Sequence, residues 1–170
     1  MLKLAGMLCI VAGAAGFGKY LGDYLKYHLE QLVEGREIFA RMDAGREYLR
    51  LPYAELLRRT AKGRSKLFDE ILTEVADEME KNREGDISAL WEAAFGKRKK
   101  QILLNEEEQE LFLALAKSLM LEGDHTQVSK IYLMQIEEKI QKAMEEKQEK
   151  QKLYGTVSLL GGLFLVILLL

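Results

Sequence analysis

The sequence predicts an all-α protein: an antiparallel bundle of about six helices, flanked by N- and C-terminal transmembrane helices. Three observations predict this fold class. Apolar residues recur three and four positions apart through the middle of the chain, which is the spacing of one helix face. The sequence contains a single proline, Pro52, and its β-branched residues do not cluster. Both ends are apolar and uncharged, although 31% of the residues of the whole chain are charged.

The C-terminal segment, residues 153–170, contains no charged side chain. As a helix it would be about 27 Å long, which is close to the hydrocarbon thickness of a bilayer, about 30 Å. The alternative is a buried helix of a soluble protein, which is less often found at the end of a small domain. We therefore expect a transmembrane anchor at residues 153–170, with Lys152 flanking the membrane.

The N-terminal uncharged segment, residues 4–18, lies between Lys3 and Lys19. It is short for a span, but both lysines can extend their ammonium groups toward water and lengthen it. A cleaved signal peptide is the competing interpretation, because Ala12, Gly13 and Ala14 resemble a cleavage site. The second apolar end favours an anchor, so the expected domains are an anchor at 1–18, a bundle at 19–152 and an anchor at 153–170.

The expected helices follow one another with short connections. The first carries an apolar stripe between residues 21 and 42, and the next three span residues 53–61, 66–81 and 87–95. Asp86 is the expected N-cap of the helix at 87–95, and Trp91 within it is an expected core residue. Residues 96–104 are expected to form a linker that carries four basic residues in a solvated loop.

The last two helices have recognisable starts. Asn105 with Glu108 fits a capping box before a helix at 106–122, and Asp124 with Gln127 fits a second one. No helix-breaking residue separates this last helix from residue 153. We therefore expect one continuous helix from the bundle into the C-terminal anchor.

Small residues recur four apart in both apolar ends, which in lipid lets two helices approach closely. The alternative is that glycine and alanine are simply common in membrane helices, and the spacing leaves both open. The candidate packing residues are Ala5, Cys9, Gly13, Gly16, Ser158 and Gly162.

Lysines gather on the bundle side of both apolar segments, so the positive-inside rule places the bundle in the cytoplasm. The net charge of −2 does not indicate a nucleic-acid surface. His28 and His125 lie far apart, and no spacing of Cys and His suits zinc. Residues 61–67 lack the residue order of a phosphate-binding loop. We therefore expect no enzyme activity, no cofactor, no metal and no small-molecule substrate, and no residues mark the partner interface.

Four stretches together carry a family resemblance: MLKLAGMLCIVAGAAGFGKY at the start, LPYAELL, ALWEAAF, and LYGTVSLLGGLFLVILLL at the end. With them the chain resembles the stage III sporulation protein AB family over residues 1–170. The resemblance implies a bundle similar to the cytoplasmic domain of F-type platform proteins of type II secretion and type IV pilus systems. It also implies two kinds of partner, a secretion-type ATPase and the other membrane components of a channel between mother cell and forespore.

The expected function is therefore a non-enzymatic platform in the mother-cell membrane that docks this ATPase from the cytoplasmic side. One alternative is an exported, membrane-tethered helical binding protein with a cleaved signal peptide. A pore or transporter subunit is a further alternative, although neither apolar segment carries an ionisable residue.

Overall fold

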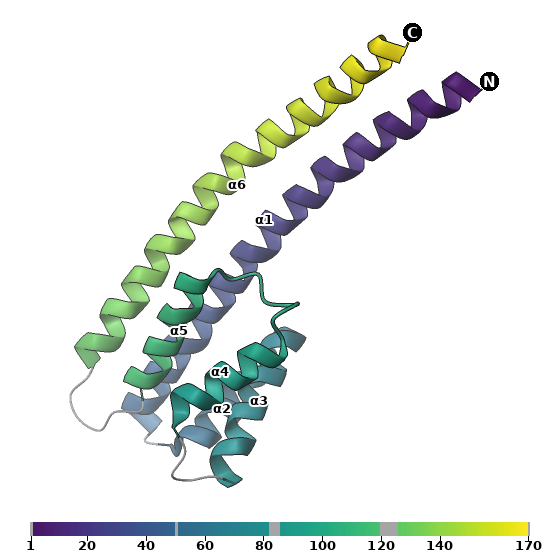
Figure 1. The fold of residues 1–170 in the computed structure, drawn as a ribbon. Helices are drawn as coiled ribbons and strands as arrows, with labels where there is room; N and C mark the ends of the chain where they lie inside the picture. Colours follow the sequence, from purple (N-terminus) through teal and green to yellow (C-terminus); the bar gives the residue numbers. More distant parts are fainter. Residues whose placement is uncertain (1, 50, 82–85, 120–125, 170) are drawn as a thin grey trace. The chain divides into compact units, whose positions relative to one another are not determined.

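The computed structural model describes residues 2–49, 51–81, 86–119 and 126–169. Within these ranges every regular element is an α-helix, so the predicted all-α class is confirmed. The helices, labelled in Figure 1, are α1 (Leu2–Leu49), α2 (Tyr53–Ala61), α3 (Lys66–Lys81), α4 (Ile87–Lys97), α5 (Glu106–Ser118) and α6 (Thr126–Leu169).

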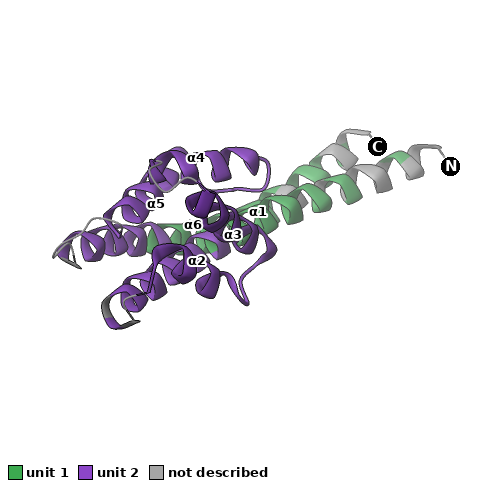
Figure 2. Ribbon diagram, turned by 90° about the horizontal axis from the view of Figure 1, so that it is seen from below, with its two compact units in different colours: residues 1–29, 141–170 green, residues 30–140 purple. Residues whose placement is uncertain are grey.

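The chain divides into two compact units (Figure 2). One contains residues 1–29 and 141–170, and the other contains residues 30–140. Both α1 and α6 contribute to both units without a break, so the expected domain boundaries after residue 18 and before residue 153 fall inside helices. The prediction that the last helix runs on from the bundle into the C-terminal apolar segment is confirmed by α6.

The transmembrane helices predicted at residues 1–18 and 153–170 are not supported by the structure. Across the ranges it describes, no helix offers an apolar stretch long enough to cross a bilayer.

An aromatic cluster forms the centre of the unit of residues 30–140. The ring of Phe39 lies 5.3 Å from that of Trp91 and 5.6 Å from that of Phe112, and Phe95 meets Trp91 edge-on at 5.9 Å. All four rings are buried, which confirms Trp91 as a core residue. Such pairs stabilise a fold by about 0.5–1.5 kcal/mol each beyond the burial of their area. Other large apolar side chains that are fully buried in this unit are Leu32, Ile38, Met42, Leu57, Ile71, Leu72, Leu115 and Ile136.

Two glycines let α1 lie close to its neighbours in this unit. A Cβ added at Gly35 would be 2.6 Å from Cζ of Phe112, and one added at Gly45 would be 2.5 Å from Cδ1 of Leu56. Neither distance is compatible with a side chain unless the neighbour moves. The predicted apolar stripe of the first helix is therefore a packing surface, and glycine is needed where an aromatic ring crosses it.

Hydrogen bonds fix α1 to the α2–α3 turn and to α6 within the same unit. Glu34 accepts from the backbone N–H of Ser65 at 2.6 Å, and Glu37 pairs with Arg64 at 2.9 Å. The hydrogen bond from Arg64 is the main reason that the pKa of Glu37 lies below its usual value. On the α6 side, the hydroxyl of Ser129 donates to the Asp43 carboxylate at 3.0 Å.

Local sequence signals account for several helix ends. Asp86 accepts from the backbone N–H of Ser88 at 3.0 Å, so the predicted N-cap of α4 is confirmed. After α2, Gly63 adopts a φ of +79°, a left-handed conformation that glycine takes at little cost. The N–H of Arg64 then donates to the carbonyl of Ala61 at 3.1 Å and completes the turn into α3.

Candidate partner interface

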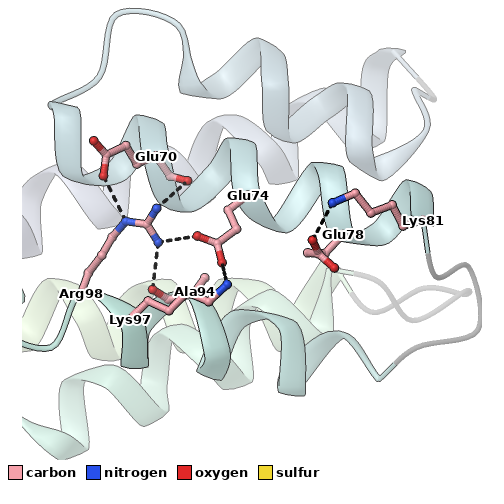
Figure 3. Close-up of polar contacts among 7 residues, drawn as sticks. All are labelled: Glu70, Glu74, Glu78, Lys81, Ala94, Lys97 and Arg98. Carbon is pink, nitrogen blue, oxygen red and sulfur yellow. Dashed lines mark hydrogen bonds and ion pairs between the residues drawn. The ribbon is translucent and has the colours of Figure 1, made fainter.

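A cluster of ion pairs joins the end of α4 to α3 (Figure 3). The guanidinium of Arg98 donates through Nε to Glu70 at 3.2 Å and through Nη1 to Glu74 at 2.7 Å. The same Nη1 also donates to the carbonyl of Ala94 at 3.2 Å, in the last turn of α4. The side chain of Arg98 is only 14% exposed. The planar guanidinium therefore fixes the end of one helix against two carboxylates of the other.

Glu74 is the centre of this cluster. Lys97 donates to its Oε1 at 2.5 Å, on the other side from Arg98 (Figure 3). The hydrogen bond from Lys97 lowers the pKa of Glu74, burial opposes this, and Arg98 lowers the pKa further. Burial works to lower the pKa of Arg98, but its hydrogen bonds to Glu74 and Glu70 raise it overall. Glu74 and Arg98 are therefore both charged at neutral pH, and their pairing stabilises the packing of α3 on α4.

A second set of ion pairs lies along α3. Arg58 of α2 bonds to Asp77 at 2.7 Å and to Glu80, and Lys81 pairs with Glu78 at 2.8 Å. These side chains are largely exposed, so each pair contributes little stability by itself.

An open groove of about 380 Å³ runs along the same edge of α3. It is lined by Asp69, Glu70, Thr73, Glu74, Asp77, Glu78, Lys81 and Arg98. Four of the five carboxylates already bind an arginine or a lysine, so a ligand would have to displace these partners. In the part of the chain that the structure describes, no group of His, Cys, Asp and Glu is placed to hold a metal ion. Most of the charges that line the groove are thus already paired with one another.

The four basic residues at 97–100 lie in two different environments. Its interpretation as a solvated linker is wrong for Lys97 and Arg98, because Lys97 is the last residue of α4 and both side chains bind α3. Lys99 and Lys100 are exposed in the connection that follows. The sequence alone could not distinguish the two halves, since the partner carboxylates lie more than twenty residues earlier in the chain.

The first expected capping box, Asn105 with Glu108, is confirmed. The second, Asp124 with Gln127, lies partly outside the described residues. Asn105 accepts from the N–H of Glu108 at 2.9 Å, and Glu108 accepts from the N–H of Asn105 at 2.8 Å. Asp124 lies outside the described residues, as does His125, and Gln127 is exposed in the first turn of α6.

The predicted membrane-flanking and packing residues are only partly described. Lys19 and Lys152 are exposed, whereas the side chains of Lys3, Ala5, Cys9 and Ser158 lie outside the described part. Gly13 and Gly16 are exposed, and a Cβ added at either would meet nothing within 4 Å. Gly162 is buried. Around Gly13 and Gly16, the described part of the chain therefore shows no close helix contact of the kind that small residues permit.

One surface feature was missed in the sequence. Four aromatic side chains between residues 17 and 27 of α1 are exposed: Phe17, Tyr20, Tyr24 and Tyr27. They lie three, four and three residues apart, a spacing that places them on one helix face. That spacing is readable in the sequence, but only the fold tells whether other helices of the chain cover the face.

The family model for stage III sporulation protein AB matches residues 3–170. Neither the curated proteins nor the solved structures gave a significant match to this chain. The match covers the long helices as well as the α2–α5 segment, and it agrees with the family suggested by the sequence. The chain belongs to the stage III sporulation protein AB family.

Proposed function

We propose that this protein is a non-enzymatic platform of a sporulation channel, which docks a secretion-type ATPase at the mother-cell membrane. Membership of the family supports a role in sporulation. The platform role and the ATPase are inferences from the resemblance of the family to F-type platform proteins.

The continuity of α1 and α6 is the observation that carries this proposal. Each helix belongs both to the unit of residues 30–140 and to the unit that contains the uncharged ends. Because neither helix is interrupted between the two units, α1 and α6 each connect the folded unit directly to an uncharged end of the chain. This is the property that a platform needs if it links a cytoplasmic motor to a membrane complex.

Membrane attachment is part of the proposal and rests on the sequence. Residues 4–18 and 153–170 carry no charge, and Lys19 and Lys152 stand at their bundle-side ends. In this arrangement the unit of residues 30–140 faces the cytoplasm, where nucleotide and the ATPase are available.

The docking step is tested with the full-length protein in phospholipid vesicles and the purified ATPase that is encoded with it. The ATPase should co-sediment with vesicles that carry the protein and should stay in solution with empty vesicles. A matched variant, Trp91→Ala, removes the central ring of the buried cluster and should abolish co-sedimentation if the folded unit is the docking surface.

Two results would refute the proposal. The ATPase could remain in solution with wild-type vesicles, or it could bind the Trp91→Ala vesicles equally well after circular dichroism shows that the variant is unfolded. A mature N-terminus near residue 15, with residues 30–140 outside the cell, would instead identify the exported binding protein as the correct alternative.

A further inference from the structure

The uncharged N-terminal segment of α1 is shorter than a bilayer is thick. Residues 4–18 measure about 22 Å as a helix, whereas the hydrocarbon core of a bilayer is about 30 Å thick. The difference is about 8 Å, and α1 continues past Lys19 without a break. Residues 19–23 of the same helix would supply this length.

Four exposed aromatic residues lie in and just beyond this extension. Phe17 is 63% exposed, Tyr20 66%, Tyr24 44% and Tyr27 53%. We call these four residues the aromatic stripe. Tyrosine is enriched where membrane helices enter the headgroup layer, because its ring is apolar and its hydroxyl forms hydrogen bonds.

We propose that the aromatic stripe contacts lipid and sets the depth of α1 in the membrane, with the edge of the hydrocarbon near Asp23 and not at Lys19. This inference rests on the proposed function, because it requires that the chain is attached to a membrane. Counted from residue 4, a length of about 30 Å ends at residue 23. A headgroup layer of about 5–8 Å then covers about the next three to five residues.

The order of side chains along α1 agrees with this depth. Phe17, which has no polar group, lies in the hydrocarbon. Tyr20 lies about 4.5 Å inside the edge, where its hydroxyl can still reach the headgroups. Tyr24 and Tyr27 lie in the headgroup layer, and Asp23, the first carboxylate of the chain, stands at its inner edge.

The two lysines beside the stripe fit the same placement. Lys19 is exposed and lies about 6 Å inside the edge, a distance that the aliphatic stem of a lysine can span. The ammonium of Lys26 lies 5.7 Å from the centre of the Tyr27 ring. Both ammonium groups can therefore meet headgroup phosphates without entering the hydrocarbon.

The C-terminal segment favours a lipid contact over a protein contact at the stripe. Residues 153–170 carry no charge and measure about 27 Å as a helix, so this span is almost complete without an extension. Residues 141–152, which precede it, contain no aromatic side chain. Aromatic residues thus extend the segment that is too short and are absent before the one that is long enough. A binding site for another protein would not be expected to follow this difference.

The test is the depth of nitroxide spin labels in the full-length protein, reconstituted in phospholipid vesicles with Cys9→Ala as background. Collisions of a label with oxygen, which dissolves in lipid, and with a water-soluble nickel complex report its depth. The label is attached in turn to Gly16→Cys, Tyr20→Cys, Tyr24→Cys and Tyr27→Cys. A Cβ at Gly16 meets nothing within 4 Å. The matched control is Tyr48→Cys, because Tyr48 is an exposed tyrosine at the other end of α1.

The ratio of oxygen to nickel collisions should fall steadily from position 16 to position 27, by about fivefold in total, and should be lowest at position 48. Serine at Tyr20, Tyr24 and Tyr27 together should move the label at position 16 toward water. Serine at Tyr48 should leave that label where it is.

Three outcomes would overturn the inference while membrane attachment stands. Labels at positions 20, 24 and 27 could be as accessible to nickel as the label at position 48, which would put the edge at Lys19. They could be shielded from both reagents, which would indicate a protein contact. The label at position 16 could stay in place in the triple serine variant, so that the rings would not set the depth.

A label at position 16 that is itself in water would refute membrane attachment, and this inference with it. Docking of the ATPase is measured separately by co-sedimentation, so its failure is distinguishable from a wrong depth of α1.

Discussion

Replacing Arg98 by methionine should destabilise the protein by about 2 kcal/mol. The change keeps most of the aliphatic side chain and removes the guanidinium that bonds to Glu70 and Glu74. Exposed ion pairs contribute about 0–1 kcal/mol, whereas removing one partner of a fully buried pair costs about 3–5 kcal/mol. Arg98 is 14% and Glu74 20% exposed, which places this pair between the two limits.

The assay is thermal unfolding of the full-length protein in detergent, followed by circular dichroism. For a chain of this size, 2 kcal/mol corresponds to a decrease in Tm of about 4–8 °C. Lys97→Met is the matched control, because Lys97 binds the same carboxylate but is 65% exposed. It should lower the Tm by no more than about 2 °C, in line with an exposed pair.

A double-mutant cycle separates the interaction energy between Arg98 and Glu74 from the other effects of each substitution. Arg98→Met combined with Glu74→Gln should cost less than the sum of the two single changes, by about 0.5–2 kcal/mol. A Tm for Arg98→Met within 1 °C of wild type would refute the reasoning. So would strict additivity, because the two side chains would then not interact.

Three further predictions follow from the fold. Gly35→Ala should destabilise the protein by about 1–3 kcal/mol because its methyl group would clash with Phe112; adding Phe112→Leu should recover part of the loss in Tm, and no recovery would exclude the clash as the cause. Asn105→Ala should cost about 1 kcal/mol through loss of the α5 cap, and an unchanged Tm would contradict that. The pKa of Glu74 is lower in the folded state, so its contribution is present above the ordinary value of 4.5 and is lost as the pH falls further. The Tm difference between wild type and Glu74→Gln should therefore shrink on acidification, and a difference that grows would show that the sign is wrong.

Local patterns were sufficient to predict the helices and several of their ends. Asn105 and Glu108 are three residues apart, so both partners of the capping box can be read from one short stretch. The apolar stripe of α1 could likewise be predicted, because Leu32, Phe39 and Met42 recur with helical spacing. All three are buried in the structure.

Contacts between helices were not predictable in the same way. Arg98 and Glu74 are 24 residues apart, and nothing in either helix alone indicates that they meet. The same holds for Gly35. A side chain is excluded at this position only because the ring of Phe112, from another helix, packs against it. The exposure of Tyr20 and Tyr24 also depends on where the other helices end, which is a property of the whole fold.

The most direct test of the proposed cytoplasmic platform is to measure on which side of the membrane residues 30–140 lie. A single cysteine at Lys62, an exposed residue after α2, would be introduced in a Cys9→Ala chain and probed with a membrane-impermeant maleimide. The account predicts a full-length chain in the membrane fraction that is unlabelled in sealed cells and labelled after permeabilisation. Labelling of sealed cells would place the helical unit outside the cytoplasm and would contradict the platform.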